Sequence, residues 1–281
     1  GRTHSRWLLP AALVLAGAAW FENFTLSTST VTAACAALPE AFSGLRIVQI
    51  SDLHGRRFDA ESRYLLELVR LQSPDLIALT GDLADEFTDF SMLPPLLDGL
   101  TALAPTFYVT GNHEWVLSRE KREALFSMLD AAGVVRLQNE YRLLKKGQAS
   151  IVLAGVDDPN GPYDQKRPAQ LVREIRQSRG RDAYILMLSH RNDELDLWAN
   201  MGVQTVLCGH GHGGIVRLPF VGAVFGTHLD LFPDYTAGLY RKGQTSMIVS
   251  RGLGGSRKLP LRIGNRPEIV TVILKAESGK V

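Results

Sequence analysis

The chain has 281 residues, of which 45% are hydrophobic and 21% charged, enough to bury the core of one large α/β domain or two small ones. A net charge of +2 argues against nucleic-acid binding driven by bulk positive charge. Two cysteines, Cys35 and Cys208, are too few for a disulfide framework. The composition leaves the oligomeric state open.

The N-terminal segment is the most apolar part of the chain. Residues 7–21 carry no charge, and Arg2, His4 and Arg6 precede them. This run is shorter than the roughly 20 residues of a full membrane span and matches the upper length of a signal-peptide core. We predict that residues 1–22 are a membrane anchor or a signal segment, which places residues 23–281 on the extracytoplasmic side of the cell membrane. The alternative is a buried or amphipathic helix.

Residues 23–281 alternate between two patterns. Thr and Ser alternate with small or apolar residues over 24–34, which predicts an exposed edge strand. Short apolar runs then predict strands buried on both faces, and amphipathic stretches between them predict helices, which indicates a layered α/β fold. The predicted buried strands are 45–51, 75–80, 106–110, 150–156, 183–189 and 203–208, and the predicted helices are 60–71, 119–132, 167–177 and 194–200.

The last third of the chain has a different pattern. Loops rich in Gly and Pro separate apolar runs at 215–220, 245–250 and 268–274. We predict three strands there, with mostly antiparallel connections, which together add a second sheet. No linker divides residues 23–281 into separate domains.

Side chains able to bind metal follow five of the predicted strands. Ligands of α/β proteins bind at the carboxyl ends of strands, so these side chains are expected to meet. A lone His or a single Asp-x-His pair is weak evidence, but five such groups in order at strand ends are not expected by chance. The groups are Asp52 with His54, Asp82 with Asp85, Asn112 with His113, His190, and His210 with His212.

The spacings suggest how these groups share ions. Residues i and i+2 of an extended segment point to the same side, so Asp52 and His54 are expected to bind one ion together. His210 and His212 have the same spacing, but a curved loop can aim them at adjacent ions. Glycines 81, 111, 209, 211, 213 and 214 allow close backbone approach, although simple turn formation also explains them.

The donor set indicates the kind of metal. Four imidazoles and two carboxylates prefer manganese, iron or zinc over magnesium or calcium. Two divalent cations with Asp52 and Asp82 leave the site positive, which favours an anionic phosphoryl group.

The ordered motifs resemble the calcineurin-like metallophosphoesterase family. They read Asp52-x-His54, Gly81-Asp82-x-x-Asp85, Gly111-Asn112-His113-Glu114, His190 and Gly209-His210-x-His212. Further along, Pro233-x-Tyr235-x-x-Gly238-x-Tyr240, Ser250-x-Gly252-Leu253-Gly254 and Asn265-x-Pro267-Glu268-Ile269 are similar to its membrane-associated YkuE-type branch. The resemblance implies a four-layer α/β/β/α sandwich with two central mixed sheets, with residues 23–281 as the catalytic domain.

The resemblance also implies roles. Asp52, His54, Asp82 and His212 would bind a first ion, and Asp82, Asn112, His190 and His210 a second. A hydroxide bridging the two ions would attack a phosphomonoester or phosphodiester. His113 would stabilise the transition state or protonate the leaving group, and Asp85 would orient His113.

Three arginines near the motifs are candidates for binding the substrate. Arg56, Arg191 and Arg251 could meet the substrate phosphate, although solvated loops also explain them. Gly211 and Ile215 stand where many relatives have Thr or Ser and Gln, and Glu86 stands where protein phosphatases commonly have Arg. One alternative is a pyrophosphatase acting on a lipid-linked or sugar-nucleotide substrate. Another is a non-catalytic metal-binding scaffold with this fold.

Overall fold

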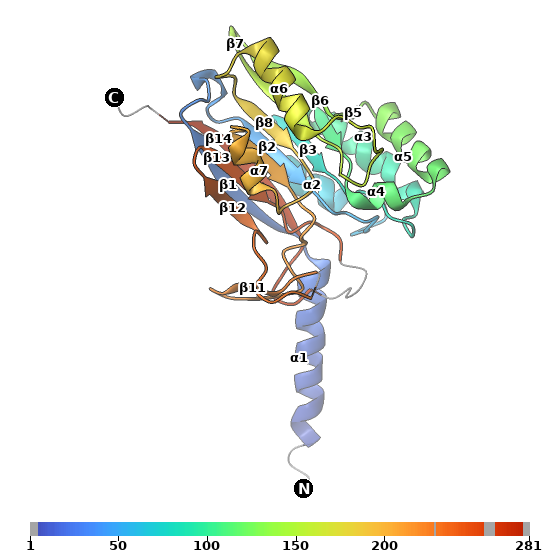
Figure 1. Ribbon diagram of the computed structural model, residues 1–281. Coiled ribbons are helices and arrows are strands. Elements are labelled where there is room, and N and C mark those ends of the chain that lie inside the picture. The colour runs from blue at the N-terminus through green and yellow to red at the C-terminus, as the bar shows by residue number, and fades with distance from the viewer. Residues whose placement is uncertain (1–4, 228, 256–261, 278–281) are drawn as a thin grey trace.

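The protein is described by a computed structural model over residues 5–227, 229–255 and 262–277. Two six-stranded mixed sheets pack face to face, and helices cover the outer face of each (Figure 1). The predicted four-layer α/β/β/α sandwich is therefore confirmed.

The first sheet contains the three strands that lead to the first predicted motifs. Its strands are parallel except where β14 meets β2. β1 lies at one edge, as predicted for residues 24–34. In spatial order the strands are β1 (Ser27–Cys35), β14 (Glu268–Ala276), β2 (Arg46–Ile50), β3 (Leu76–Thr80), β4 (Thr106–Val109) and β5 (Val135–Arg136).

The second sheet contains the strands that lead to the histidine motifs. Its central strands are parallel, and β12 and β6 pair antiparallel at the two edges. In spatial order the strands are β12 (Gly238–Lys242), β13 (Thr245–Val249), β9 (Thr205–Cys208), β8 (Ile185–Leu188), β7 (Ala149–Gly155) and β6 (Glu140–Lys146).

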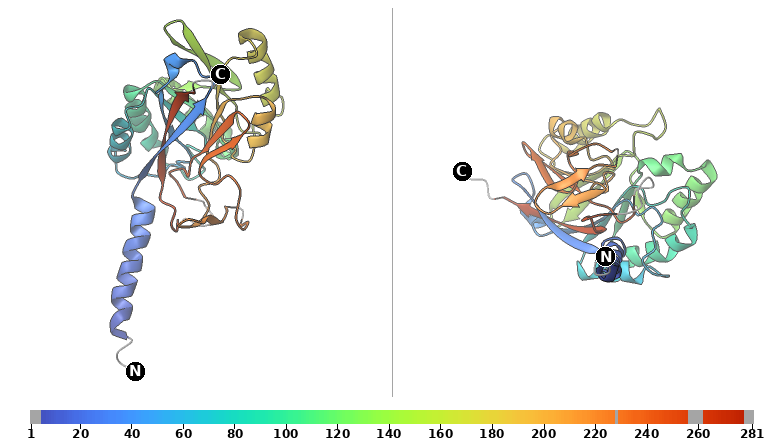
Figure 2. Two further views of the ribbon diagram at one scale, coloured as in Figure 1. Left: turned by 90° about the vertical axis from the view of Figure 1, so that its left-hand side faces the viewer. Right: turned by 90° about the horizontal axis from the view of Figure 1, so that it is seen from below.

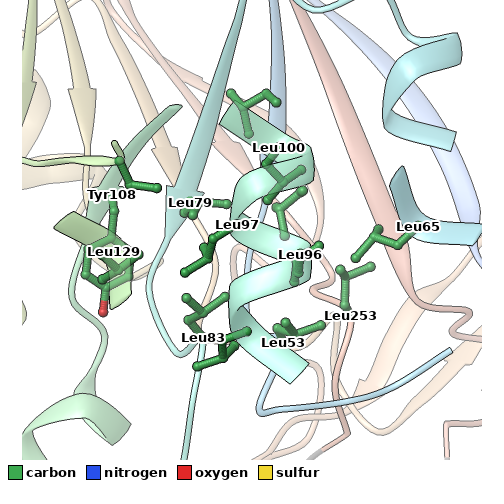
Figure 3. Close-up of a cluster of buried hydrophobic side chains, with 14 of the residues drawn as sticks. Leu53, Leu65, Leu79, Leu83, Leu96, Leu97, Leu100, Tyr108, Leu129 and Leu253 are labelled. Atoms are coloured by element: carbon green, nitrogen blue, oxygen red, sulfur yellow. The ribbon is translucent and has the colours of Figure 1, made fainter. Parts of the chain in front are cut away.

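Three hydrophobic layers hold the sandwich together. Apolar side chains between the sheets form the central layer, for example Ile47 and Leu207. On the first sheet, Leu79 lies next to Leu97 of α3, in a cluster that also contains Leu96 (Figure 3). Burying a leucine of this kind stabilises the fold by about 1.5–3 kcal/mol. The covering helices are α2 (Arg63–Leu71), α3 (Leu93–Leu103) and α5 (Arg119–Ala131) on the first sheet, and α6 (Pro168–Arg179) and α7 (Leu195–Asn200) on the second.

α3 is a helix that the sequence pattern did not predict. Its first turn contains Pro94 and Pro95, which a helix tolerates there because its first N–H groups have no intrahelical acceptor. Gly99 lies against α2, where a Cβ atom would come within 2.4 Å of Leu66 Cδ1. The residues typical of loops thus serve helix initiation and helix packing.

The predicted arrangement of the C-terminal strands is wrong. β14 inserts between β1 and β2, and β13 inserts between β12 and β9, so each joins a different central sheet. The reason is burial: all five residues of β13 and most of β14 are buried, which an added outer sheet would not provide. Only β10 (Val216–Leu218) stays outside, paired with β11 (Gly222–Phe225) in a small hairpin.

α1 (Ser5–Phe24) projects from the sandwich beside the β10–β11 hairpin (Figures 1 and 2). Its last residues bind the domain, since the Asn23 side chain accepts the backbone N–H of Arg262 and donates to its carbonyl. In the described part of the chain, no helix has both the length and the apolar character of a membrane span.

Candidate metal centre

The predicted ligands lie on loops that converge at one rim of the sandwich. Asp52, Asp82 and Asn112 follow β2, β3 and β4 of the first sheet, each within three residues of the strand end. His190 and His210 follow β8 and β9 of the second sheet in the same way. The centre therefore takes ligands from both sheets.

One cluster consists of Asp52, His54, Asp82 and His212, whose ligand atoms lie within 4.8 Å of one another. The Nε2 atoms of His54 and His212 are 3.3 Å apart. His54 Nε2 is 3.6 Å from Asp82 Oδ2, and His212 Nε2 is 3.6 Å from Asp52 Oδ1. The four side chains are the set expected for the first ion.

A second cluster consists of Asp82, His190 and His210. His190 Nε2 lies 3.2 Å from Asp82 Oδ2 and 3.1 Å from His210 Nδ1. Asn112 joins this cluster, since its Oδ1 is 3.2 Å from His190 Nε2. The opposite ring nitrogen of His190, Nδ1, lies 2.8 Å from the Thr80 carbonyl and can donate to it, which leaves Nε2 facing the cluster.

The same oxygen, Asp82 Oδ2, belongs to both clusters. The other oxygen, Oδ1, accepts the backbone N–H of His113 at 2.8 Å, which fixes the orientation of the carboxylate. The Asp52 carboxylate is held similarly, because it accepts the backbone N–H of His210 at 3.0 Å. Both carboxylates are thus oriented by the loops that carry the other ligands.

The ligand loops adopt unusual backbone conformations. Five candidate ligands have φ between +49° and +66°, where residues other than glycine are uncommon. They are Asp52, His54, Asp82, His210 and His212. The extended geometry expected between Asp52 and His54 is therefore wrong, although the two side chains do meet in one cluster. Clustered strain of this kind is typical of functional sites.

Glu114 is a buried residue of the site to which the sequence analysis gave no role. Its carboxylate accepts backbone N–H groups of Asp82, Leu83, Ala84 and Gly111 at 2.7–3.3 Å. It therefore joins the loop after β3 to the loop after β4. The position of Glu114 in the Gly-Asn-His-Glu motif is the sequence signal for this role. An acidic residue that follows a turn more often caps a helix, so the motif alone does not indicate it.

Electrostatics favour cation binding. Burial lowers the pKa of His212 to about 3 and, with nearby His190 and Arg191, that of His210 to about 4, so both rings are neutral ligands at pH 7. Burial also opposes protonation of His190, but Asp82 and Asp52 outweigh it and raise its pKa to about 10. This negative potential around His190 is the potential that would attract a divalent cation.

The residues present fit two divalent transition-metal ions. Imidazole nitrogens bind such ions at about 2.0–2.1 Å, so two nitrogens 3.3 Å apart can share one ion. Asp52 and Asp82 are 0% and 1% exposed, and buried carboxylates require compensating positive charge. The mixture of imidazole and carboxylate donors suits manganese, iron or zinc.

His113 and Asp85 are not arranged as expected. His113 lies edge-on to His54, with ring centroids 4.7 Å apart. Asp85 faces His54 instead, its Oδ2 3.7 Å from His54 Nδ1, and accepts hydrogen bonds from Thr88 Oγ1 and the Phe87 N–H. Among the described residues, no hydrogen bond joins Asp85 to His113. Asp85 is therefore placed to orient His54.

Of the three predicted substrate arginines, only Arg191 contacts the centre. Its guanidinium forms a bidentate pair with buried Asp158 at 2.6 and 3.0 Å, and its Nη1 lies 3.0 Å from His210 Nε2. Arg56 packs on Phe24 and Phe58 and donates to the Asn23 carbonyl. This side chain binds the end of α1.

The remaining arginine, Arg251, also has a structural partner. Its Nη2 donates to Glu268 Oε1 at 3.0 Å and to Ser27 Oγ at 3.1 Å. Glu268 and Ser27 begin β14 and β1, so this ion pair joins the loop after β13 to the edge of the first sheet. Neither Arg56 nor Arg251 is therefore positioned as expected for substrate.

Comparison with known families assigns the part of the chain that carries the motifs to one family. Residues 45–214 match the family described as calcineurin-like phosphoesterase, which covers more than half of the chain. The chain belongs to this family. The resemblance stated from the motifs is confirmed, and a YkuE protein is among the relatives.

Individual relatives match most of the length of this chain. It is 31% identical over 267 residues to "Uncharacterized metallophosphoesterase YkuE" of Bacillus subtilis (strain 168), covering 92% of this chain and 89% of that one. It is 31% identical over 234 residues to "Phosphodiesterase YaeI" of Escherichia coli (strain K12), covering 82% of each. It is 27% identical over 253 residues to "Transmembrane protein with metallophosphoesterase domain" of Danio rerio, covering 85% of this chain and 55% of that one.

Proposed function

We propose that this phosphoesterase hydrolyses phosphomonoesters or phosphodiesters with two divalent transition-metal ions, manganese, zinc or iron, as cofactors. Asp52, His54, Asp82 and His212 would hold one ion, and Asp82, Asn112, His190 and His210 the other. The observation that carries this proposal is the position of Asp82 Oδ2, which is 3.6 Å from His54 Nε2 and 3.2 Å from His190 Nε2.

Two bound cations would polarise the phosphoryl group and lower the pKa of water enough to provide a nucleophile at neutral pH. The residues of the chain orient the carboxylate that the two ions would share. Asp82 Oδ1 is engaged by the His113 N–H, so Oδ2 alone is left to be shared. The His113 side chain lies at the partly exposed edge of the centre, where it can donate a hydrogen bond to a phosphoryl or leaving-group oxygen.

Arg191 is the best-placed residue for the substrate anion. Asp158 fixes its guanidinium next to His210, and a planar guanidinium suits phosphate oxygens. Arg191 and His210 also line a cavity of ≈ 360 Å³ together with Asp193 and Tyr235. We propose this cavity for the leaving group. The name of the E. coli relative adds support for a phosphodiester.

The test combines metal analysis with turnover. The purified chain is loaded with manganese, zinc or magnesium and assayed on p-nitrophenyl phosphate, bis-p-nitrophenyl phosphate and a sugar-nucleotide pyrophosphate. We expect two ions per chain and hydrolysis of at least one ester. Asp82→Asn should lose bound metal and at least about 10²-fold in turnover, since both ions depend on this carboxylate.

The matched control is Asp98→Asn, a change of the same kind at an exposed position of α3. It should retain both ions and full turnover. Metal binding without turnover of any substrate would favour the non-catalytic scaffold. Turnover confined to the pyrophosphate would favour the pyrophosphatase.

His113 is tested separately from the ligands. His113→Ala should bind both ions normally and lose rate, because His113 touches the reacting oxygens and not the metals. Loss of metal in this variant would show that its proposed role is wrong.

We also propose a location for the enzyme. The apolar residues 7–21 support an anchor at the cell membrane with an extracytoplasmic catalytic domain, and one relative is named a transmembrane protein. Protease accessibility of the domain in intact cells would test this orientation.

A further inference from the structure

Exposed apolar side chains gather at one end of the molecule. Eighteen large hydrophobic residues are exposed among those whose side chains are described. Four lie in α1, seven lie between residues 218 and 232, and one is Ile263, so twelve occupy the end that carries α1 and the β10–β11 hairpin (Figures 1 and 2). The other six belong to other segments of the chain, at Tyr64, Leu71, Phe87, Val116, Tyr163 and Leu197.

Backbone pairings join the segments that carry these side chains outside α1. The Phe232 N–H donates to the Val224 carbonyl of β11, and Phe225 bridges to Leu231, which attaches the loop after β11 to the hairpin. The Arg217 N–H of β10 donates to the Ile263 carbonyl. We define the apolar face as Leu218, Phe220, Val221, Leu231, Phe232 and Ile263, which are 49–109% exposed.

α1 leaves the domain next to this apolar face. The Asn265 N–H donates to Glu22 Oε2 at 3.0 Å, and Asn23 pairs with the backbone of Arg262, the neighbour of Ile263. Trp20 and Phe24 stack on the exposed side of α1, with ring centroids 6.2 Å apart. The helix and the apolar face therefore present aromatic and aliphatic side chains at the same end.

The shape of the surface indicates what covers it. Phe220 is 109% and Val221 58% exposed, because they form the turn of a hairpin that stands away from the sandwich. A protruding apolar turn next to a projecting apolar helix has no fixed counter-surface in the described chain. Lipid accommodates such a shape without a complementary pocket, and Trp and Phe are favoured at the boundary between headgroups and acyl chains.

We propose that the apolar face inserts into the interface of a lipid bilayer, beside α1. The metal centre is then held at the level of the lipid headgroups. Asn265 Nδ2 donates to the carbonyls of His212 and Gly214 at 2.8 and 2.6 Å, so the segment that carries Ile263 also holds a candidate ligand loop. The proposal requires insertion of side chains and does not require a membrane span or catalysis.

The direct test reports the surroundings of the apolar face residue by residue. Both native cysteines are buried, at 5% and 0% exposure, so an environment-sensitive fluorophore can be placed through Phe220→Cys or, as control, Tyr163→Cys. Tyr163 is 101% exposed and lies outside the apolar face. The full chain is mixed with phosphatidylcholine vesicles that contain brominated lipid.

We expect the emission of the label at position 220 to shift to shorter wavelength and to be quenched by the brominated lipid. The emission of the label at position 163 should remain that of a label in water. A chain bound to vesicles with the label at 220 still in water would overturn the proposal, since α1 alone would then make the contact. A blue shift at 220 without vesicles, together with a dimer in sedimentation, would overturn it in favour of a second copy of the chain.

Binding strength gives a second readout. Phe220→Ser with Phe232→Ser should weaken vesicle binding about tenfold or more, with little dependence on salt, because apolar burial drives it. Tyr163→Ser with Leu197→Ser, at exposed positions elsewhere, should leave binding unchanged. Equal binding by both double variants would contradict a role for the apolar face.

Discussion

The Asp85 carboxylate shows how a residue outside the candidate ligands can control them. It is held by Thr88 and the Phe87 N–H and faces His54 Nδ1 at 3.7 Å. A carboxylate behind a liganding histidine fixes the ring and raises its basicity. Asp85 is therefore expected to affect metal affinity through His54.

We predict that Asp85→Asn lowers the affinity for one of the two ions about 10–100-fold and leaves the affinity for the other nearly unchanged. Titration with Mn²⁺ or Zn²⁺ followed by calorimetry would resolve the two affinities. Asp98→Asn serves again as the exposed control. Unchanged metal affinity combined with a slower reaction would instead support the Asp85–His113 pairing first inferred from the motifs.

Glu114 has a structural role that can be measured without substrate. Glu114→Gln replaces an acceptor oxygen with an amide NH2 that faces backbone N–H groups, so we predict a loss of about 2–4 kcal/mol in the free energy of unfolding. Urea denaturation would measure this loss, with the exposed Glu277→Gln as control. A loss as small as that of the control would contradict the role assigned to Glu114.

Glu194 provides a pH-dependent prediction. Burial, with Asp193 adding to it, raises the pKa of Glu194 from 4.5 to about 7. The folded state then holds the proton more tightly than the unfolded state, so stability from this group is full below pH 4.5 and falls as the pH rises towards 7. Glu194→Gln should therefore match the wild type near pH 4 and exceed it by about 1 kcal/mol above pH 7, allowing for partial exposure.

Unfolding by urea across this pH range would measure the difference for Glu194→Gln, and Glu277→Gln should show none. A wild type that gains stability over Glu194→Gln as the pH rises would show that the direction is wrong.

The loops after β3 and β4 pack closely against each other at Gly111 and Asp82. A Cβ at Gly111 would lie 2.2 Å from Asp82 Oδ1 and 2.6 Å from the Asp82 backbone nitrogen. Gly111→Ala should therefore displace Asp82 and lower the affinity for both ions at least about tenfold. Metal analysis after dialysis would detect this loss. Gly17→Ala, in α1 with open space around it, is the control, and equal metal content in the two variants would contradict this prediction.

How far the sequence predicts these elements depends on burial. β2, β3, β4, β7, β8 and β9 were predicted because uninterrupted apolar runs identify strands covered on both faces. The candidate ligands followed from their positions after these runs. α3 was missed because Pro94, Pro95 and Gly99 have local roles that only packing reveals.

The partners of the arginines and the sheet positions of the last strands were not predictable from the sequence. Arg56 meets Asn23 across 33 residues of chain, and Arg251 meets Glu268 across 17. β13 and β14 enter different sheets although they are neighbours in sequence. Such partners depend on long-range topology, which local pattern does not encode.

At the scale of the whole molecule, the candidate ions would join the two sheets. The first sheet supplies Asp52, His54, Asp82 and Asn112, and the second supplies His190, His210 and His212. Ligands that bind only the folded state stabilise it by about 2.7 kcal/mol at 100 times their dissociation constant. We therefore predict that a chelator lowers Tm by several degrees and that Mn²⁺ or Zn²⁺ restores it, as measured by calorimetry. An unchanged Tm in a chain shown to have lost its metal would contradict this coupling of the sheets.

The central claim is that two ions share one carboxylate oxygen. A crystal of the manganese-loaded protein, measured for anomalous scattering at the manganese edge, tests it most directly. The account predicts two peaks on either side of Asp82 Oδ2, one next to His54 and His212 and the other next to His190 and His210. A single peak under saturating manganese, or peaks away from Asp82, would contradict it.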